Sequence, residues 1–258
     1  MDKKPESVFK YTSVSKYSIM SLEDQEIFLN APCNFNDPYD FAPNFRLSRP
    51  SKGDIDKSHE IIQKQNPQDK LTIIPEYQGQ KGIERLSDQL FNEMYEPLKE
   101  SILRSAKKGG VSCFSESNDI ILQWSHYADH HKGFCLEFDT KETPFSKVCK
   151  VDYVTEFPEI NPLFIYEEDR INTYINLLKI KFIDWSYERE WRIIGPSAGT
   201  KLKYSPKALN AVYFGTKIDS QDMERISDIV RSHNENVQLY KGLMNETRFH
   251  IDFEKIDI

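Results

Sequence analysis

The amino-acid sequence predicts a mixed α+β domain that carries a helical insertion. Short segments of strand composition are scattered among helical ones, without the strict alternation that a doubly wound parallel sheet requires. One long segment, 46–110, is dominated instead by helical periodicity. Because no repeat or low-complexity linker divides the 258 residues, we expect a single domain over 1–258 with 46–110 inserted in it.

Strands are expected where β-branched and aromatic residues gather in short runs bounded by turn residues. Pro32 ends the second run, and Gly133 precedes the run FCLEF. In chain order the expected strands are Ser7–Thr12, Glu26–Ala31, Val111–Phe114, Phe134–Phe138, Lys147–Val154, Tyr187–Ile194, Ala211–Phe214, Val237–Tyr240 and Thr247–Asp252.

Helices are expected where apolar residues recur at helical spacing, as Leu86, Leu90 and Met94 do. The Ser and Asp of the segment SESND, 115–119, are residue types that cap the helix after them. In chain order the expected helices are Ser15–Met20, Asp54–Gln65, Ile83–Lys107, Ile120–Ala128, Ile165–Phe182 and Ser220–His233.

The segment Asn34–Asp40 is rich in Asn, Asp and Pro, which favour tight turns. We expect the side chains of Asn36 and Asp37 to bond nearby backbone amides, and so to be structural rather than catalytic.

Composition limits the function classes. The net charge of -7 argues against a generally basic nucleic-acid-binding protein. No apolar run is long enough to span a membrane, and the start of the chain is charged rather than signal-like, so we expect a cytoplasmic protein with no membrane partner. The cysteines lie far apart without metal-ligand spacing, which predicts four free thiols: Cys33, Cys113, Cys135 and Cys149.

Common catalytic loops are absent from the sequence. It has no Walker loop, no Gly-x-Gly-x-x-Gly and no Gly-x-Ser-x-Gly. His126 and His130 are four residues apart and could share a metal, but a third ligand is missing from this segment, and we expect no metal site. Trp124, His126 and Tyr127 offer a stacking surface to a planar ligand, whereas Trp124 could equally fill the core.

The segment KFIDWSYEREWR, 181–192, places two of the three tryptophans beside a Glu-x-Glu pair. Within the expected strand, side chains alternate between faces. Glu188, Glu190 and Arg192 then share one face, while Trp191 on the other face anchors the strand to the core. The Glu pair is either a solvated edge neutralised by nearby cations or the wall of a pocket, which the neighbouring aromatic residues favour.

Five segments together resemble one bacterial family, catalogued as domain of unknown function 2971. They occur in the family's order and leave only the helical insertion and the C-terminal third unmatched. WSHYAD and W-x-x-E-x-E-W-R are specific to the family, whereas FKY alone is not. The segments are FKY (9–11), FNDPYD (35–40), VSCFSES (111–117), WSHYADHHKGFCLEFD (124–139) and KFIDWSYEREWR (181–192).

The family in turn distantly resembles the ADP-ribosyltransferase fold. This resemblance implies small mixed or antiparallel sheets that form a cleft, in which NAD is held as a substrate. Nicotinamide leaves as an oxocarbenium-like cation develops on the ribose, and a nearby carboxylate can stabilise that cation. The resemblance implies Glu190 as this catalytic carboxylate, and Glu188 as the group that activates or positions the acceptor.

The resemblance also implies that NAD is held by three elements in chain order: a first strand, a Ser-containing strand and the Glu strand. Lys10 and Tyr11 match the first by position, and Ser112 and Ser115 match the second. Lys10 stands where Arg or His is usual, which departs from the pattern for the diphosphate contact. The other expected NAD contacts are Trp124, His126, Tyr127, Trp185 and Arg192.

We therefore expect an NAD-consuming, ADP-ribosyltransferase-like enzyme, of the kind found among toxins and antiphage effectors, with an unidentified acceptor macromolecule. Two alternatives stay open: a module that binds a nucleotide without turning it over, and a hydrolase or nuclease whose Glu pair binds a metal. The transferase predicts that the polar side chains of 9–11, 112–115 and 188–192 lie on strands and converge on one cavity. It also predicts that Lys10 and Glu190 lie on the same side of the domain.

Overall fold

The computed structural model describes residues 3–41, 44–65 and 79–257, and the chain divides into two compact units. Unit 1 comprises Met1–Asn34, Gly109–Val151 and Ile183–Ile258, and unit 2 comprises Phe35–Lys108 and Asp152–Phe182. The chain therefore passes back and forth between the units, and most of the predicted helical insertion lies in unit 2.

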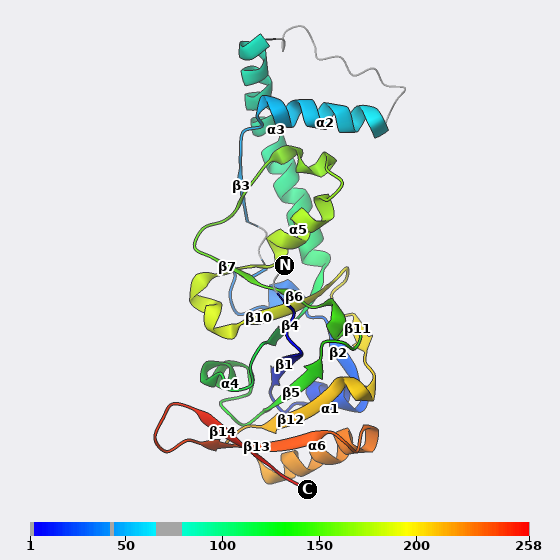
Figure 1. Ribbon diagram of the computed structural model, residues 1–258, viewed down its shortest axis with the longest axis vertical. Coiled ribbons are helices and arrows are strands. Elements are labelled where there is room, and N and C mark those ends of the chain that lie inside the picture. The colour runs from blue at the N-terminus through cyan, green and yellow to red at the C-terminus, as the bar shows by residue number, and fades with distance from the viewer. Residues whose placement is uncertain (1–2, 42–43, 66–78, 258) are drawn as a thin grey trace. The chain divides into compact units, whose positions relative to one another are not determined.

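Unit 1 is built on an eight-stranded sheet in the order β14-β13-β12-β5-β1-β4-β10-β6 (Figure 1). Neighbouring strands are antiparallel, except that β12 and β13 are parallel. The predicted mixed α+β class is thus confirmed, but the expectation of small sheets is wrong for this unit, because hydrogen bonding continues without a break from β10 through β4 and β1 to β5. The strands are β1 (Ser7–Thr12), β4 (Gly110–Ser115), β5 (Phe134–Asp139), β6 (Cys149–Lys150), β10 (Glu190–Gly195), β12 (Leu209–Phe214), β13 (Gln238–Met244) and β14 (Ile251–Lys255).

The two faces of this sheet bury different residues. On the face that we call the α1 face, Val8, Phe114 and Trp191 pack in one core with residues of α1 (Lys16–Glu23) and α6 (Ser220–His233). On the opposite face, the α4 face, Tyr11 and Cys135 pack against Trp124 of α4 (Ile121–Tyr127). A two-stranded pair, β2 (Glu26–Phe28) with β11 (Lys201–Lys203), completes the strands of unit 1 in the described residues.

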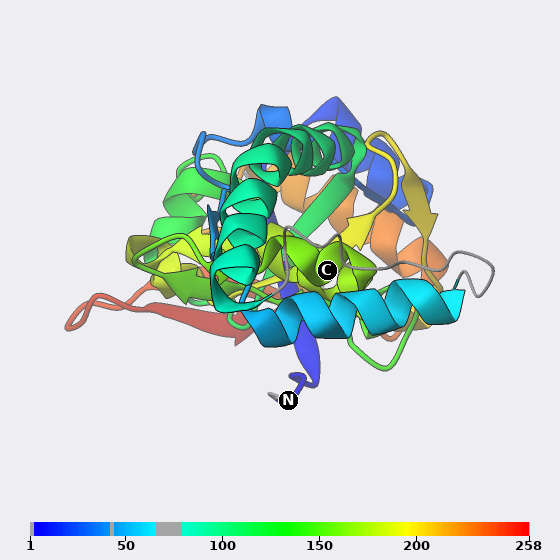
Figure 2. The ribbon, with the colours of Figure 1, turned by 90° about the horizontal axis from the view of Figure 1, so that it is seen from above.

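Unit 2 is mainly helical and has its own core. Its helices are α2 (Lys52–Gln65), α3 (Gly79–Lys108) and α5 (Arg170–Leu178). The axis of α3 bends along its length (Figure 2), and Pro97 lies inside this helix, where its ring cannot continue the hydrogen-bond ladder. One cluster of buried apolar residues comprises Phe45, Leu47, Leu98, Ile102, Phe164 and Leu177, and another comprises Ile55, Ile83 and Leu163.

Unit 2 also contains two parallel pairs of short strands, β3 (Arg46–Leu47) with β8 (Glu159–Ile160) and β7 (Asp152–Val154) with β9 (Ile180–Phe182). Short 3₁₀ turns join elements in both units: η1 (Pro32–Asn34), η3 (Phe145–Lys147), η4 (Pro162–Tyr166), η5 (Ile183–Glu188) and η6 (Pro206–Ala208).

Several predicted boundaries are wrong for identifiable reasons. The helix predicted over Ile165–Phe182 ends at Leu178, because the residues after it pair as β9 with β7. The last strand begins at Ile251 instead of Thr247, because Asn245 Oδ1 accepts the backbone N–H groups of Thr247 and Arg248 and so makes a turn. The predicted strand Glu26–Ala31 ends at Phe28, and Lys147–Val154 is divided between β6 and β7.

Within the described ranges, every helix is too short or too polar to cross a membrane.

Candidate functional site

The Glu-x-Glu pair lies where η5 meets β10. The strand begins at Glu190 rather than at Tyr187, because Arg189 has a φ of 47°, in the left-handed region that interrupts a strand. The carbonyl of Arg189 accepts the backbone N–H of Glu116 at 3.1 Å. Glu188 therefore belongs to the turn, and its predicted alternation with Glu190 along one strand is wrong.

Glu190 and Arg192 are two residues apart on β10 and so point to the same face. Arg192 Nε donates to Glu190 Oε1 at 2.8 Å, and Arg192 Nη2 donates to Oε2 at 3.1 Å. The exposed fractions of the Arg192 and Glu190 side chains are 0% and 4%. A bidentate contact of this kind fixes the orientation of the carboxylate.

Glu188 is buried as well, and side chains of two elements, α4 and β4, hold it. Its Oε1 accepts the hydroxyl of Tyr127 at 2.8 Å, while its backbone carbonyl accepts Ser115 Oγ at 2.7 Å and Gln123 Nε2 at 2.8 Å. Glu188 and Glu190 are each only 3% exposed, so the alternative of a solvated edge is wrong for this pair.

Gln123 is a site residue that the sequence analysis missed. It lies one turn before Tyr127 on α4, so both side chains reach Glu188 from the same side of the helix. The signal that could have indicated it is a polar residue at helical spacing from Tyr127, immediately before the WSHYAD segment.

The register of the sheet separates the other predicted residues. Phe9 pairs with Ser115, and Ser115 pairs with Glu190. Paired residues share a face and neighbours in sequence do not, so Ser115 and Glu190 lie on the α4 face whereas Lys10 lies on the α1 face. The expectation that Lys10 converges with Glu190 on one cavity is therefore wrong.

Lys10 and Ser112 meet on the α1 face. Lys10 Nζ donates to Ser112 Oγ at 2.9 Å, and it lies 5.0 Å from the ring centroid of Phe114. Lys10 and Tyr11 match the first of the three elements expected to hold NAD, and Ser112 and Ser115 match the second. Of these four residues, Tyr11 and Ser115 share the α4 face with Glu190.

Tyr11 is buried on the α4 face and holds the start of α4. Its hydroxyl donates to Ser117 O at 2.9 Å and accepts the backbone N–H of Ile120 at 3.2 Å. Burial raises the pKa of Tyr11, so the hydroxyl stays neutral. The predicted capping of α4 by Ser or Asp is wrong, since Ile120 is the N-cap and no side chain caps it.

The remaining predicted contacts differ in exposure. Trp124 is fully buried and its Nε1–H donates to Asn118 O at 2.7 Å, so it fills the core. His126 is exposed, and Trp185 is partly buried with its ring centroid 6.0 Å from that of Tyr187. Ser115, Tyr127, Glu188, Glu190 and Arg192 therefore form the group that the structure brings together.

Among the residues that the structure describes, no group of three or more His, Cys, Asp or Glu side chains is arranged to hold a metal ion.

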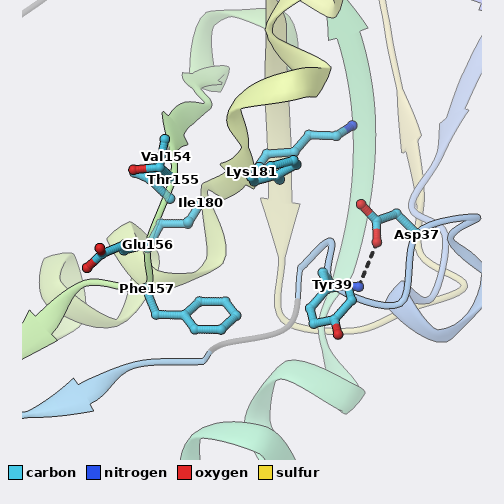
Figure 3. Close-up of a pocket in the computed structure, with 9 residues that line it drawn as sticks. Asp37, Tyr39, Val154, Thr155, Glu156, Phe157, Ile180 and Lys181 are labelled. Atoms are coloured by element: carbon cyan, nitrogen blue, oxygen red, sulfur yellow. Dashed lines mark hydrogen bonds between the residues drawn. The ribbon is translucent and has the colours of Figure 1, made fainter.

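The FNDPYD segment lines a separate cavity of about 320 Å³ within unit 2. Tyr39 and Phe157 lie on its wall, and Asp37 Oδ1 accepts the backbone N–H of Tyr39 at 2.8 Å (Figure 3). The predicted turn role is thus confirmed for Asp37, while that of Asn36 stays a prediction. Lys181 Nζ lies 3.1 Å from Asp40 Oδ2, and both side chains are buried.

Comparison with known proteins gives one match. No curated protein and no solved structure matches the chain. The family described as "Protein of unknown function (DUF2971)" matches residues 123–193, a segment that begins at Gln123 and includes Tyr127, Glu188, Glu190 and Arg192. The resemblance found in the sequence is confirmed over this segment, because residues 123–193 match the model of the DUF2971 family of proteins of unknown function.

Proposed function

We propose that the chain is an NAD-consuming enzyme of the ADP-ribosyltransferase type, with Glu190 as its catalytic carboxylate. The observation that carries the proposal is the order of three neighbouring strands, β1, β4 and β10. They present Tyr11, Ser115 and Glu190 on the α4 face. This is the chain order of first strand, serine strand and glutamate strand that the resemblance implies for these enzymes.

The expectation from sequence places Lys10 and Glu190 on the same side of the domain, and in that form it fails. A site built on Lys10 and Ser112 is excluded, since both lie on the α1 face, away from Glu190. Tyr11 replaces Lys10, and it brings a neutral hydroxyl in place of a cation. The carboxylates on the α4 face therefore suit contacts to the ribose. On the same face, the first strand offers no positive charge to the diphosphate.

Glu190 would act on the charge that develops as the bond from ribose to nicotinamide breaks. The bonding electron pair leaves with nicotinamide, and positive charge builds up on the ribose. A carboxylate that is already fixed in orientation stabilises that charge without having to reorganise. Arg192 supplies this preorganisation through its two hydrogen bonds to Glu190.

Glu188 would act on the incoming nucleophile. Its carboxylate is fixed by the hydroxyl of Tyr127, and its backbone is held by Ser115 and Gln123. A carboxylate held in this way can take the proton that the acceptor loses as it bonds to the ribose. The two carboxylates would thus have different roles. Glu190 would stabilise the positive charge on the ribose, and Glu188 would accept the proton of the acceptor.

The proposal is tested by mixing the protein with NAD and measuring free nicotinamide. Glu190→Gln should lower turnover by about 10²- to 10³-fold, the loss typical of one preorganised electrostatic contact. Glu137→Gln is the matched control, since Glu137 accepts hydrogen bonds from Ser7 and Tyr213 at 2.7 Å each, on a strand that does not adjoin β10. Thermal melting of both variants checks that they fold.

Each outcome of this measurement points to one class of protein. Turnover that is unchanged in Glu190→Gln, or no turnover by the wild type, overturns the proposal. NAD binding without nicotinamide release indicates a binding module. Cleavage of a nucleic acid that depends on added Mg²⁺ or Mn²⁺ and on Glu190 indicates the hydrolase.

A further inference from the structure

A second cavity, of about 680 Å³, lies on the α1 face of unit 1. Its walls come from β1 and β5 of the sheet, from α1, and from the β2–β11 pair. This volume is in the range of sites for small organic ligands. The cavity is separated from the Glu190 site by the thickness of the sheet, because Lys10 lines it while Glu190 lies on the α4 face.

Part of the cavity wall is apolar and open to solvent. Tyr17, Met20 and Phe28 line the cavity, and their exposed fractions are 80%, 39% and 47%. Single exposed apolar residues are common on protein surfaces, but three around one cavity form a patch that an apolar ligand can cover.

Lys10 brings a basic side chain to the wall of the cavity. Its Nζ donates to Ser112 Oγ at 2.9 Å and to the carbonyl of Cys113 at 3.2 Å, and both acceptors are uncharged oxygens. Within the described ranges no ion pair joins Lys10 to a carboxylate. Burial lowers the pKa of Lys10, and nearby groups that include the Glu190 carboxylate oppose this shift.

Glu26, the carboxylate in the cavity wall, already forms ion pairs with two lysines. Glu26 Oε2 lies 2.8 Å from Lys201 Nζ, and Glu26 Oε1 lies 3.2 Å from Lys203 Nζ. The lining therefore holds Lys10 and Lys201 against Glu26, an excess of one positive charge in a chain whose net charge is -7. This charge and the apolar wall together match a ligand with an anionic head and an apolar body.

We propose that this cavity binds a small apolar carboxylate, with its carboxylate on Lys10 Nζ and its apolar part against Tyr17, Met20 and Phe28. The carboxylate would give the Lys10 ammonium the counter-ion that its neutral partners do not supply. The site is independent of the proposed NAD chemistry, since it uses none of the residues on the α4 face.

The test compares octanoate with octanamide, a neutral molecule of the same chain length, by calorimetric titration of the full chain. Octanoate should bind at least about tenfold more tightly than octanamide, the discrimination expected from one charged hydrogen-bonded contact. Lys10→Met should remove this discrimination. Lys203→Met is the matched control, because Lys203 is a lysine of the same region that pairs with Glu26 but does not line the cavity. This variant should still bind octanoate more tightly than octanamide.

A variant at the cavity mouth keeps the test decisive if Lys10→Met does not fold. Met20→Glu changes a side chain that is 39% exposed and places a negative charge beside the ligand, so octanoate should bind at least about tenfold more weakly. Equal affinity for octanoate and octanamide in the wild type, or unchanged octanoate affinity in Met20→Glu, overturns the proposal. Glu190→Gln should bind octanoate as the wild type does, whether or not NAD is consumed.

Discussion

At the residue scale, unit 1 buries charged side chains on both faces of its sheet, and the two faces differ in the groups that these side chains contact. Glu190 and Arg192 compensate each other through two hydrogen bonds on the α4 face, and their side chains are 4% and 0% exposed. Lys10, on the α1 face, is held by neutral oxygens. A buried ion pair contributes little by itself, but removing one partner leaves a charge that is neither solvated nor paired.

Arg192→Met should therefore destabilise the protein by about 3–5 kcal/mol, because it keeps the volume of the side chain but leaves Glu190 without its guanidinium. Urea denaturation measures this change in the free energy of unfolding. Lys57→Met is the control, since Lys57 pairs with Glu167 at 2.8 Å with side chains 61% and 38% exposed. Removing that exposed pair should cost much less stability than removing the buried one, because solvent screens it. Similar losses in the two variants would show that Glu190 and Arg192 are solvated in solution.

At the element scale, α4 joins the candidate site to the sheet. Tyr11 of β1 binds the N-terminal end of α4, and Gln123 and Tyr127 of α4 bind Glu188. The position of Glu188 thus depends on a helix of only seven residues, which has no side-chain cap of its own. Isolated helices of this length are marginal, so tertiary contacts decide where α4 lies.

Tyr11→Phe should cost about 1–3 kcal/mol, because it leaves the partly buried carbonyl of Ser117 and N–H of Ile120 without the hydroxyl. Urea denaturation measures the loss. Tyr39→Phe, at a side chain that is 66% exposed, is the control and should change stability by under about 0.5 kcal/mol. If the two variants are equally stable, the hydroxyl of Tyr11 does not hold α4.

The same elements show what could be predicted from the sequence. β1, the strand FCLEF and the helix at Ser220–His233 were predictable, because their composition and periodicity are local properties. The burial of Trp191 followed from alternation along its strand. The face on which Lys10 lies could not be predicted, because register depends on how separate segments pair. A shift of one residue moves every side chain of the strand to the other face.

The turn before β10 could not be predicted from the local sequence either. Arg189 adopts a positive φ although nothing in its residue type favours it, and the fold imposes this conformation through the bond from Glu116 to its carbonyl. Glu188 consequently reaches Tyr127 from a turn rather than from a strand. The family match over 123–193 was predictable, because it rests on residue identity instead of geometry.

At the scale of the whole molecule, the hydrophobic clusters of the described residues each lie within one unit. One cluster in unit 1 contains Val8, Trp191 and Leu239, and one in unit 2 contains Leu98 and Ile102. The central strands β1, β4 and β10 come from three different segments of unit 1. The sequence predicts one domain, whereas hydrophobic clusters that are each confined to one unit favour two units that unfold separately.

Two probes can distinguish these descriptions, because all three tryptophans, Trp124, Trp185 and Trp191, lie in unit 1. Tryptophan fluorescence then follows unit 1, while far-UV circular dichroism also follows the helices of unit 2. Ile102→Ala and Leu239→Ala each remove a core side chain, 5% and 1% exposed, and should each cost about 2–5 kcal/mol within their own unit.

With separate unfolding, Ile102→Ala lowers the midpoint of a transition seen by circular dichroism and leaves the fluorescence transition in place. Leu239→Ala lowers the fluorescence midpoint. The reason is that a cavity in one core weakens contacts only within that core, and effects at separate sites add. If either variant shifts both signals together, the chain unfolds as one cooperative domain, and the single domain predicted from the sequence is the correct description.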